Sequence, residues 1–379
     1  MTDTLLSNGK LVLNDEIVSG NLLIRDGLIA QIDSGSTQSP SDDLDGDYLI
    51  PGLVELHTDH LEGHFHPRPG VNWPAAAAVI AHDAQIAASG ITTVFDALRA
   101  GTFDPGDISA TEGEGLSRAI AAAQAGGQLR AQHFIHIRCE LPCPDTTEAT
   151  ERLVATSVPH LISIMDHTPG ARQFTSLDKF RQYYLGKKLI LPEKIEAYIQ
   201  ERIELQQQHA VRNKAAILNL AKRLNVKLAS HDDATAAHVE EALADEVVIA
   251  EFPTTAESAK AAHEAGLAVL MGAPNVVRGG SHSGNISAAE VAASGHLDIL
   301  SSDYVPSSLL NAAFNLSSHV EGLSLPEVLR TVTINPAKAA GLNDRGSLAK
   351  GLRADLVQVR IHDGLPVVRR VWTNGQRVM

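Results

Sequence analysis

Short apolar runs that alternate with longer segments of helical periodicity are the feature of this sequence that most restricts its fold. Apolar runs bounded by turn residues are typical of buried strands, and their alternation with helices is typical of a parallel sheet covered by helices. Eight such runs occur, at residues 49–59, 91–97, 133–140, 160–167, 225–233, 246–253, 267–274 and 297–304. Helices are expected between them at residues 74–89, 193–224, 234–244, 255–265 and 287–293.

Eight strand–helix units favour a (β/α)8 barrel of the TIM type over an open doubly wound sheet, which usually has fewer strands. The barrel is expected to span residues 51–342 and to end with the helix "SLPEVLRTVTINPAKAAGL". Residues 1–50 and 343–379 instead indicate short strands separated by turn dipeptides such as Asp-Gly. Because the two ends of the chain are alike, we expect them to pair into one small β-sandwich domain beside the barrel. The predicted class is α/β.

Net charge and cysteine content exclude several classes of function. A formal net charge of -14 argues against a general nucleic-acid-binding protein, which needs a basic face for phosphate contacts. No apolar run reaches the roughly 18 residues of a membrane span, and the first residues lack the pattern of a signal peptide. The only cysteines are Cys139 and Cys143, which fits a reducing compartment. We expect a cytoplasmic protein without nucleic-acid or membrane partners, and a homo-oligomer is compatible with the sequence.

Polar residues close nearly every apolar run. The closing residues are His57, Asp59, Asp96, His136, Arg138, Glu140, Asp166, His167, His231, Asp232, Asp233, Glu251 and Asp303. In a barrel the active site lies at the carboxyl ends of the strands, so these side chains are expected at the mouth of the site. Imidazoles and carboxylates that converge on one cavity are the ligands of a divalent metal, with zinc favoured and manganese or iron as alternatives.

A structural role for these residues is the competing interpretation. A single His or Asp at a strand end is more often a hydrogen-bonded structural residue than a metal ligand. Seven strands that end in this way are different, because uncompensated carboxylates facing one cavity would repel each other and lose hydration. A bound cation offsets both costs. We therefore predict a metal centre that holds one or two ions.

The strand-end motif "PGLVELHTD" and the late segment "TVTINPAKAAGLNDRGSLAKGLRADLV" resemble the amidohydrolase superfamily. Within that superfamily, nearly the whole chain resembles enzymes of phosphonate catabolism, through segments such as "PRPGVNWP", "MDHTPGARQF" and "MGAPNVVRGGSHSGN". The resemblance implies a metal-dependent hydrolase. Its implied substrate is a ribose 5-triphosphate that carries a 1-phosphonate, and its implied products are the 5-phosphate and pyrophosphate.

The resemblance also implies a set of ligands, with two departures from the superfamily pattern. Most members have His-x-His on the first strand, where this chain has His57-Thr58-Asp59, and no lysine closes a strand to bridge two metals, so Glu140 is the natural substitute. The implied metal ligands are His57, Asp59, Glu140, His167, His231 and Asp303. Asp303 is also the implied acceptor of a proton from the attacking water. His136, Asp232 and Asp233 are expected to orient ligand histidines, although an N-cap of the next helix is an equal interpretation for one of the two aspartates.

Basic residues stand beside glycine or proline in three loops. Converging backbone amides and bidentate arginines suit phosphate oxygens, so the expected partner is an anionic, phosphorylated sugar. The predicted substrate contacts are Arg68, Arg172, Arg278, Gly279, Gly280 and His282. Each arginine on its own is more readily interpreted as a solvated surface side chain, and it is the glycine loop after the seventh strand that favours phosphate binding. His60, His64 and His66 are interpreted as loop residues that are solvated or that support the site.

Two other functions compete with this hydrolase. The first is a cyclic amide hydrolase or an aminopurine deaminase on the same metal barrel, because a fold does not determine its substrate. The second is a non-catalytic, metal-bound subunit of a phosphonate-degrading assembly. The basic loops favour a phosphorylated substrate, and a ligand set poor in cysteine that leaves room for water favours catalysis.

Overall fold

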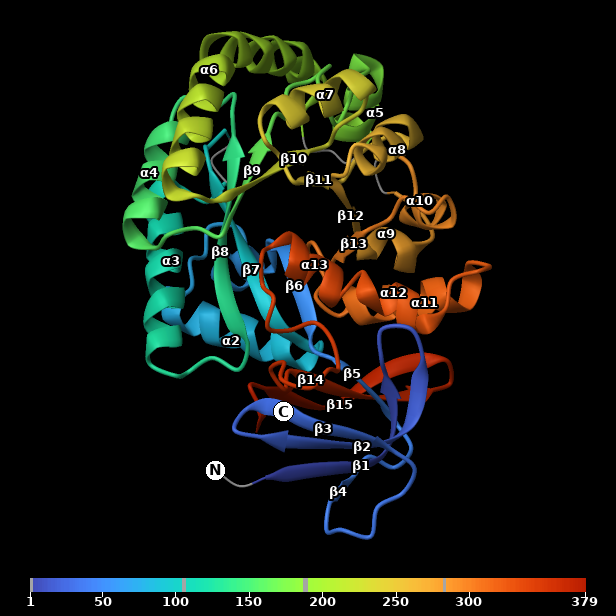
Figure 1. The fold of residues 1–379 in the computed structure, drawn as a ribbon. Coiled ribbons are helices and arrows are strands. Elements are labelled where there is room, and N and C mark those ends of the chain that lie inside the picture. Colours follow the sequence, from blue (N-terminus) through green and yellow to red (C-terminus); the bar gives the residue numbers. More distant parts are fainter. Residues whose placement is uncertain (1–2, 104–106, 187–189, 282–283) are drawn as a thin grey trace.

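The computed structural model describes residues 3–103, 107–186, 190–281 and 284–379, which form a barrel of parallel strands beside a smaller β domain (Figure 1). The barrel strands are β6 (Leu53–Thr58), β7 (Ile91–Ala100), β8 (Gln132–Glu140), β9 (Leu161–Met165), β10 (Lys227–His231), β11 (Ile249–Glu251), β12 (Ala268–Gly272) and β13 (Ile299–Ser301). They follow one another around the sheet in chain order. The first and last strands meet where the Thr58 hydroxyl donates a 2.6 Å hydrogen bond to the carbonyl oxygen of Asp303. The predicted (β/α)8 barrel is confirmed.

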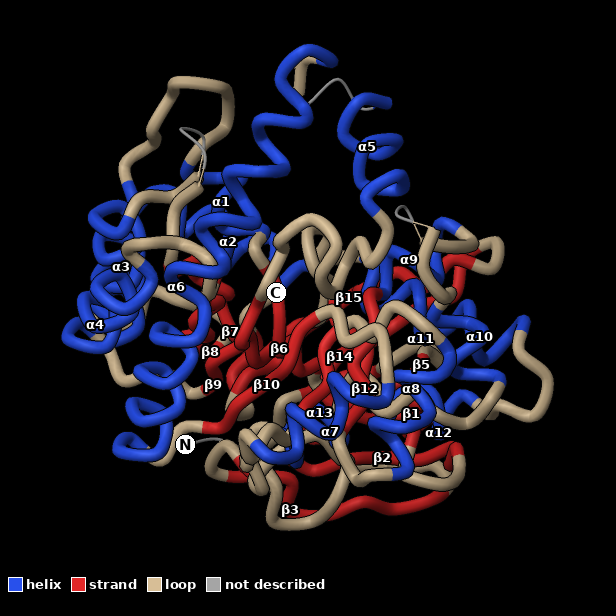
Figure 2. Tube along the Cα trace, turned by 90° about the horizontal axis from the view of Figure 1, so that it is seen from above, coloured by secondary structure: helices blue, strands red, loops and turns tan. Residues whose placement is uncertain are grey.

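Helices surround the strands when the molecule is seen from above (Figure 2). They are α1 (His60–Phe65), α2 (Ala75–Ala88), α3 (Ala110–Ala125), α4 (Thr146–Thr156), α5 (Leu177–Gly186), α6 (Ile195–Leu224), α7 (Ala236–Ala244), α8 (Ala256–Glu264), α9 (Ala273–Arg278), α10 (Ala288–Ala293), α11 (Ser308–His319), α12 (Leu325–Arg330) and α13 (Ile334–Ala339), with a 3-10 turn η1 (Pro192–Lys194) before α6. The five predicted helices correspond to α2, α6, α7, α8 and α10.

Two segments differ from their prediction. The His-rich segment after the first barrel strand, expected as a loop, forms the short helix α1, which buries Leu61 and Phe65. The predicted final helix is divided into α12 and α13 at residues 331–333. Threonine hydroxyls there bond back to carbonyls of the preceding turn, and Pro336 has no N–H with which to continue a helix.

Both ends of the chain build the β domain. Its strands are β1 (Thr4–Val12), β2 (Ile17–Arg25), β3 (Leu28–Ser34), β4 (Asp42–Asp43), β5 (Tyr48–Pro51), β14 (Leu356–His362), β15 (Leu365–Thr373) and β16 (Gln376–Arg377). The sheet order is β16-β15-β14-β5-β1-β2-β3, with β4 beside β1. Although β3 and β15 lie near opposite ends of this order, Ile29 and Trp372 belong to one buried core cluster. The sheet therefore folds over its own core, as a sandwich does.

The barrel interior changes from apolar to polar along its strands. Its lower part is filled by Phe95, Phe134, Leu161, Ala229, Ile249, Leu270 and Ile299. Because strand side chains repeat every two residues, the next inward positions toward the carboxyl ends are predictable. At those positions stand His136, Ser163, His231, Glu251, Gly272 and Ser301. The fold thus places a polar layer above a packed apolar floor.

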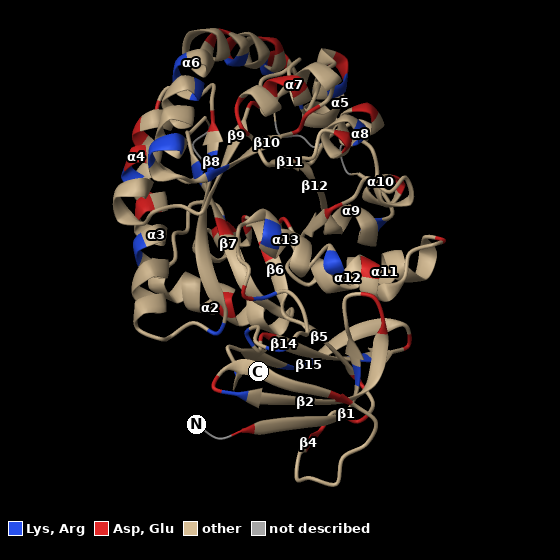
Figure 3. Ribbon diagram, viewed as in Figure 1, with Lys and Arg blue, Asp and Glu red and all other residues tan. Residues whose placement is uncertain are grey.

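Helix α6 is the longest helix, and charged residues of both signs occur along it (Figure 3). In the part of the chain that the structure describes, no helix is both long and apolar enough to cross a membrane.

Trp372 offers a test of the β-domain core, because its side chain is only 2% exposed whereas Trp73 is 53% exposed. Replacing Trp372 by alanine is expected to lower the free energy of unfolding by about 3–5 kcal/mol, since the change removes a large side chain and leaves a cavity. The matched Trp73→Ala change is expected to cost about 0.5 kcal/mol or less. Urea denaturation followed by circular dichroism measures both, and equal losses would contradict the assignment of Trp372 to the core.

Candidate metal centre

One cavity opens above the polar layer at the carboxyl ends of the barrel strands. Its wall includes His57, Asp59, His167, His231 and Asp303. These are five of the six residues predicted as metal ligands, and the sixth, Glu140, is not part of this wall. The fold therefore brings most of the predicted ligand set together, although the residues come from strands that are far apart in the sequence.

His167, His231 and Asp232 form a group of ligand-type atoms in the cavity. One atom from each lies within 4.8 Å of the other two. Oδ2 of Asp232 is 3.0 Å from Nδ1 of His231 and 3.5 Å from Nε2 of His167. These contacts are ion pairs. Among the described residues, neither Nδ1 of His231 nor Oδ2 of Asp232 makes a hydrogen bond, although both atoms are buried. Buried imidazole and carboxylate atoms without partners fit a divalent cation.

Glu140 lies behind His167 and uses both carboxylate oxygens to hold it. The backbone N–H of His167 donates to Oε1 at 3.0 Å, and its Nδ1 donates to Oε2 at 2.5 Å. Burial disfavours the charged form of His167, but Glu140 and Asp232 outweigh burial and raise the pKa of His167 to about 10. The contacts orient His167 so that Nε2 faces Asp232. The role of Glu140 as a bridging ligand stays a prediction.

His57 is fixed by a second buried group beneath the cavity. Its Nδ1 donates to Oε1 of Glu251 at 3.1 Å. The hydroxyl oxygen of Ser163 lies 2.5 Å from both Oε2 of Glu251 and Nε2 of His136, and Nδ1 of His136 donates to the carbonyl oxygen of Leu56 at 2.9 Å. Burial, and then the charge of Arg138, lower the pKa of His57. His57 is therefore a neutral imidazole, which is the form that binds metals.

Asp303 and Glu55 lie where the barrel closes. Glu55 accepts hydrogen bonds from the backbone N–H of His57 at 2.7 Å, the Ser301 hydroxyl at 2.7 Å and the Ser302 N–H at 2.5 Å. These bonds tie β6 to β13 and fix the position of Asp303. Burial, and then the charge of Asp59, raise the pKa of Asp303 to about 8. A carboxyl group in this environment accepts a proton more readily than an exposed one.

Asp59 is held by an arginine at the cavity wall. Arg138 donates to Oδ2 of Asp59 at 3.0 Å, and both residues line the cavity. Asp59 is also the N-cap residue of α1, directly after β6. The ion pair joins the first and third barrel strands at the rim and places a fixed positive charge beside the predicted ligands.

Three residues that line the cavity have left-handed backbone conformations. The φ angles are 58° at Asp232, 54° at Phe252 and 53° at Asp303. Asp232 and Phe252 directly follow β10 and β11, and Asp303 lies two residues after the end of β13. Residues other than glycine rarely adopt this conformation, and it is concentrated at functional sites. The turn directs the Asp232 and Asp303 side chains toward the cavity.

The predicted substrate contacts do not all meet in this cavity. Arg278 and Gly280 line it, and Gly279, with a φ of 79°, ends α9 between them. Arg172 instead pairs with Asp233 and, at 2.6 Å, with Glu241. Arg68 is exposed in the segment after α1 and is not part of the wall. His282 lies outside the described residues, and all these roles in substrate binding stay predictions.

Two expectations about aspartates are corrected by the structure. The N-cap of α7 is Thr235, whose hydroxyl accepts from the N–H of His238, so neither Asp232 nor Asp233 caps that helix. Asp96 does not point into the cavity. It lies on the outer face of β7, where it pairs with His82 of α2 at 2.8 Å. The inward residue at that level is Phe95, so the alternation along β7 turns Asp96 outward.

Several cavity residues were not singled out from the sequence as site residues. These include Gln173, Asn275, Asn285 and Tyr304, whereas Arg138 lines the cavity as expected for a strand-closing residue. Asn275 lies in the short helix α9, and the other three lie in the segments that follow barrel strands, where no periodic pattern marks them.

Comparison with known proteins gives a family and a full-length relative. A model described as "Amidohydrolase family" matches residues 166–379. The chain is 46% identical over 376 residues to the alpha-D-ribose 1-methylphosphonate 5-triphosphate diphosphatase of Escherichia coli (strain K12), covering 99% of this chain and 100% of the relative. It is also 32% identical over 156 residues to a D-hydantoinase of Rhizobium radiobacter, covering 40% of this chain and 30% of that protein.

Solved structures share the fold. The N-isopropylammelide isopropylaminohydrolase of Burkholderia multivorans superimposes with a TM-score of 0.67 at 19% identity, covering 100% of this chain and 98% of that one. An N-acetyl-D-glucosamine-6-phosphate deacetylase of Mycobacterium smegmatis gives a TM-score of 0.65 at 17% identity, covering 99% of this chain and 100% of that one. At such low identity these similarities establish the fold alone.

Glu251 offers a test of how the cavity holds a cation. Replacing Glu251 by glutamine is expected to weaken Zn²⁺ binding in the cavity about 10- to 100-fold, because the carboxylate that orients His57 is lost. Isothermal titration of the metal-free protein measures the change. The matched Glu264→Gln variant, exposed on α8, is expected to bind like the wild type. Unchanged affinity in Glu251→Gln would remove Glu251 from the support of the centre.

Proposed function

The chain belongs to the amidohydrolase family, and from this membership we propose that it is a metal-dependent diphosphatase of phosphonate catabolism. The proposed reaction is hydrolysis of α-D-ribose 1-methylphosphonate 5-triphosphate to the 5-phosphate and pyrophosphate. The full-length relative with 46% identity supports this assignment. The proposed partner is therefore a small, anionic, phosphorylated sugar.

The observation that carries the proposal is that a phosphate-binding loop and the ligand cluster border the same cavity. Arg278 and Gly280 line the cavity that also contains His57, His231 and Asp303. Arg278 is exposed to solvent at the end of α9, and Gly279 and Gly280 both have positive φ angles. A guanidinium beside flexible backbone amides matches the geometry of phosphate oxygens. Such a loop has no obvious use for a neutral cyclic amide.

The residues of the cavity fit a divalent ion, which we propose to be zinc, with manganese or iron as alternatives and one or two ions bound. His57, His167, His231, Asp232 and Asp303 would hold it. Imidazole nitrogen and carboxylate oxygen are the donor set that zinc binds in hydrolases. When bound, the ion activates water and offsets negative charge on phosphate oxygens.

The chain's own side chains would carry the remaining steps. Asp303 accepts a proton through a carboxylate oxygen as a water oxygen bonds to the α-phosphorus. The bond from that phosphorus to the bridging oxygen breaks, and pyrophosphate leaves with the electron pair. Arg278 pairs with the departing phosphates, and Arg138 adds positive charge at the opposite rim. Glu55 acts as a positioning residue, because its hydrogen bonds to the β13 end fix where Asp303 lies.

We place this reaction in the cytoplasm, which agrees with the two buried free thiols, Cys139 and Cys143. A homo-oligomer stays a prediction from the sequence.

The Asp303→Asn variant tests the proposed proton acceptor. It is expected to retain metal and to lose about 100-fold or more of its turnover, because asparagine cannot take the proton. Pyrophosphate release from a ribose or nucleoside 5-triphosphate measures turnover, and elemental analysis of the same sample measures metal. The control is Asp363→Asn in the exposed β14–β15 turn, which is expected to behave like the wild type. Undiminished turnover in Asp303→Asn refutes the assigned role.

Arg278 tests the recognition of the polyphosphate. Replacing Arg278 by alanine is expected to weaken binding of the triphosphate by about 1–3 kcal/mol more than binding of the monophosphate product. The control is Arg369→Ala, an exposed arginine of β15 in the other domain. Equal losses for both ligands would remove Arg278 from the polyphosphate contacts. Turnover of cyclic amides or aminopurines alone would refute the phosphorus chemistry itself.

A further inference from the structure

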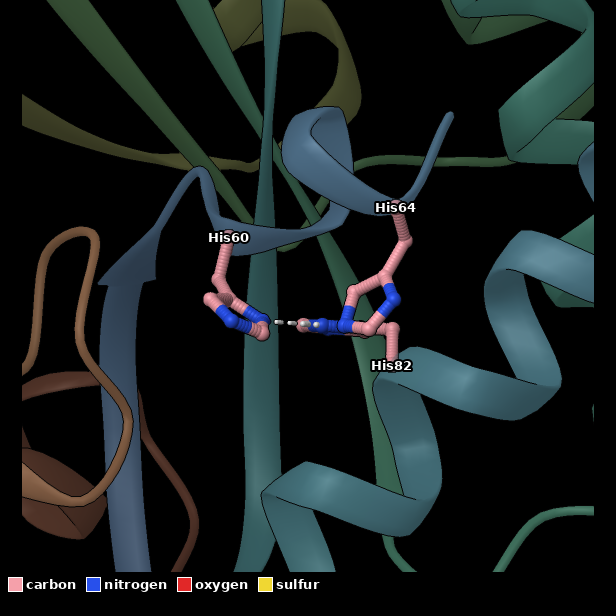
Figure 4. A group of neighbouring side chains, drawn as sticks. All are labelled: His60, His64 and His82. Carbon is pink, nitrogen blue, oxygen red and sulfur yellow. Dashed lines mark hydrogen bonds between the residues drawn. The ribbon is translucent and has the colours of Figure 1, made fainter. Parts of the chain in front are cut away.

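Three histidines outside the cavity are brought together by two helices. His60 and His64 are four residues apart on α1, so they project from the same face of that helix, and His82 faces them from α2. Figure 4 shows the three rings turned toward one another, with one nitrogen of His64 beside the hydrogen bond that joins His60 to His82. None of the three residues lines the cavity of the candidate centre.

The spacing of the three rings matches the coordination of a small cation. Nδ1 of His60 lies 3.2 Å from Nδ1 of His82, and one nitrogen from each of the three rings lies within 4.8 Å of the other two. Tetrahedral zinc with Zn–N distances of about 2.0–2.1 Å places its nitrogens about 3.3 Å apart. Two of the rings are already at this separation, and a nitrogen of the third lies within 4.8 Å of both.

His82 is held by a carboxylate in the manner of a metal ligand. Its Nε2 donates to Oδ1 of Asp96 at 2.8 Å, which leaves the Nδ1 lone pair directed at His60. Asp96 also accepts from Nδ1 of His133 at 2.7 Å, and Asp83 lies 3.3 Å from the other nitrogen of His133. A carboxylate behind a histidine fixes its ring and raises its basicity as a ligand. Asp96, which the sequence predicts at the cavity, therefore holds His82 and His133 instead.

His64 supplies a nitrogen that needs a partner. Its Nε2 is buried, and it has no hydrogen-bond partner among the described residues. The His64 ring centroid lies 4.8 Å from that of His60 and 6.0 Å from that of His82. A buried nitrogen that faces two other imidazoles gains a partner if a cation lies between the three rings.

We propose that His60, His64 and His82 form a second cation site, which binds a divalent ion of the zinc class through three imidazole nitrogens. Donors that are all nitrogen favour zinc, copper or nickel over magnesium or calcium. Three protein ligands leave a fourth position for water. The site is distinct from the cavity, because its supporting aspartate lies on the outer face of β7 and not in the barrel.

The proposed ion would act on the cavity through α1. This helix begins immediately after Asp59, which lines the cavity and pairs with Arg138. An ion shared between α1 and α2 would join the two helices and hold the first turn of α1. His60, His64 and His82 are therefore positioning residues for Asp59, and they do not touch the reacting atoms.

Counting bound Zn²⁺ in variants tests the second site. The His231→Asn background removes a ligand of the cavity and leaves the trio intact. In that background we expect one Zn²⁺ to remain bound per chain after dialysis, and we expect His64→Gln to remove it. The matched control is His66→Gln, a histidine of the same segment outside the trio, which pairs with Glu112 at 3.6 Å and is expected to retain the ion. Elemental analysis measures the metal content.

Thermal unfolding provides a second measurement on the same variants. Added Zn²⁺ is expected to raise the Tm of the His231→Asn protein and to have no such effect once His64→Gln is combined with it. If His64→Gln does not fold, His60→Asn replaces it, because His60 is also only partly buried. Retention of the ion in the combined variant, or equal loss in His66→Gln, overturns the proposal. If the three histidines only form hydrogen bonds with one another, no Zn²⁺ remains bound to the His231→Asn protein, with or without His64→Gln, and the proposal is overturned.

Discussion

The alternation of side chains along parallel strands is the constraint on which the rest of this structure depends. In most barrel strands the inward positions repeat every two residues, so one position belongs to the apolar floor and the next belongs to the cavity. Strand β6 departs from this pattern at a register irregularity, where Leu56 joins the floor and the adjacent His57 lines the cavity. Phe134 and His136 on β8, and Ile249 and Glu251 on β11, are such pairs. The same rule turns the intervening residues outward, where they pack against helices. A polar residue in a strand is therefore either a cavity residue or an outer one, and its position in the alternation decides which.

Charge balance then determines what the polar layer can do. Most of its carboxylates already have donors: Glu55 receives two N–H groups and a hydroxyl, Glu140 holds His167, and Glu251 holds His57. Asp232 is different, because its Oδ2 is buried and lacks a hydrogen-bond partner among the described residues. An unpaired buried carboxylate oxygen is costly, and a cation is the partner that offsets the cost. The predicted metal centre thus coincides with a buried carboxylate oxygen that, among the described residues, has ion-pair contacts with His231 and His167 but no hydrogen bond.

Much of the fold was predictable because burial acts on long runs of sequence. All eight barrel strands and the helices α2, α6, α7, α8 and α10 lie where the pattern of apolar residues predicts them. The site was less predictable, because contacts between strands decide it. The resemblance proposes Glu140 as a bridging ligand, a role that stays a prediction, and only the structure shows that Glu140 holds His167. Sequence also could not reveal that Asp233 would be neutralised by Arg172, since a loop 61 residues away brings that arginine to it.

The His-rich stretch after the first barrel strand illustrates how one short segment serves two places. Asp59 and His60 are adjacent, yet Asp59 faces the cavity and Arg138, whereas His60 faces α2 and His82. The turn from β6 into α1 separates them, because a helix that starts at the strand end carries its next residues away from the barrel axis. A chain that continued as a strand would have placed every second residue in the cavity. The helix divides the imidazoles and carboxylates of this stretch between the barrel interior and its outer surface. The many histidines and acidic residues of the motif therefore belong to two environments and not to one large ligand set.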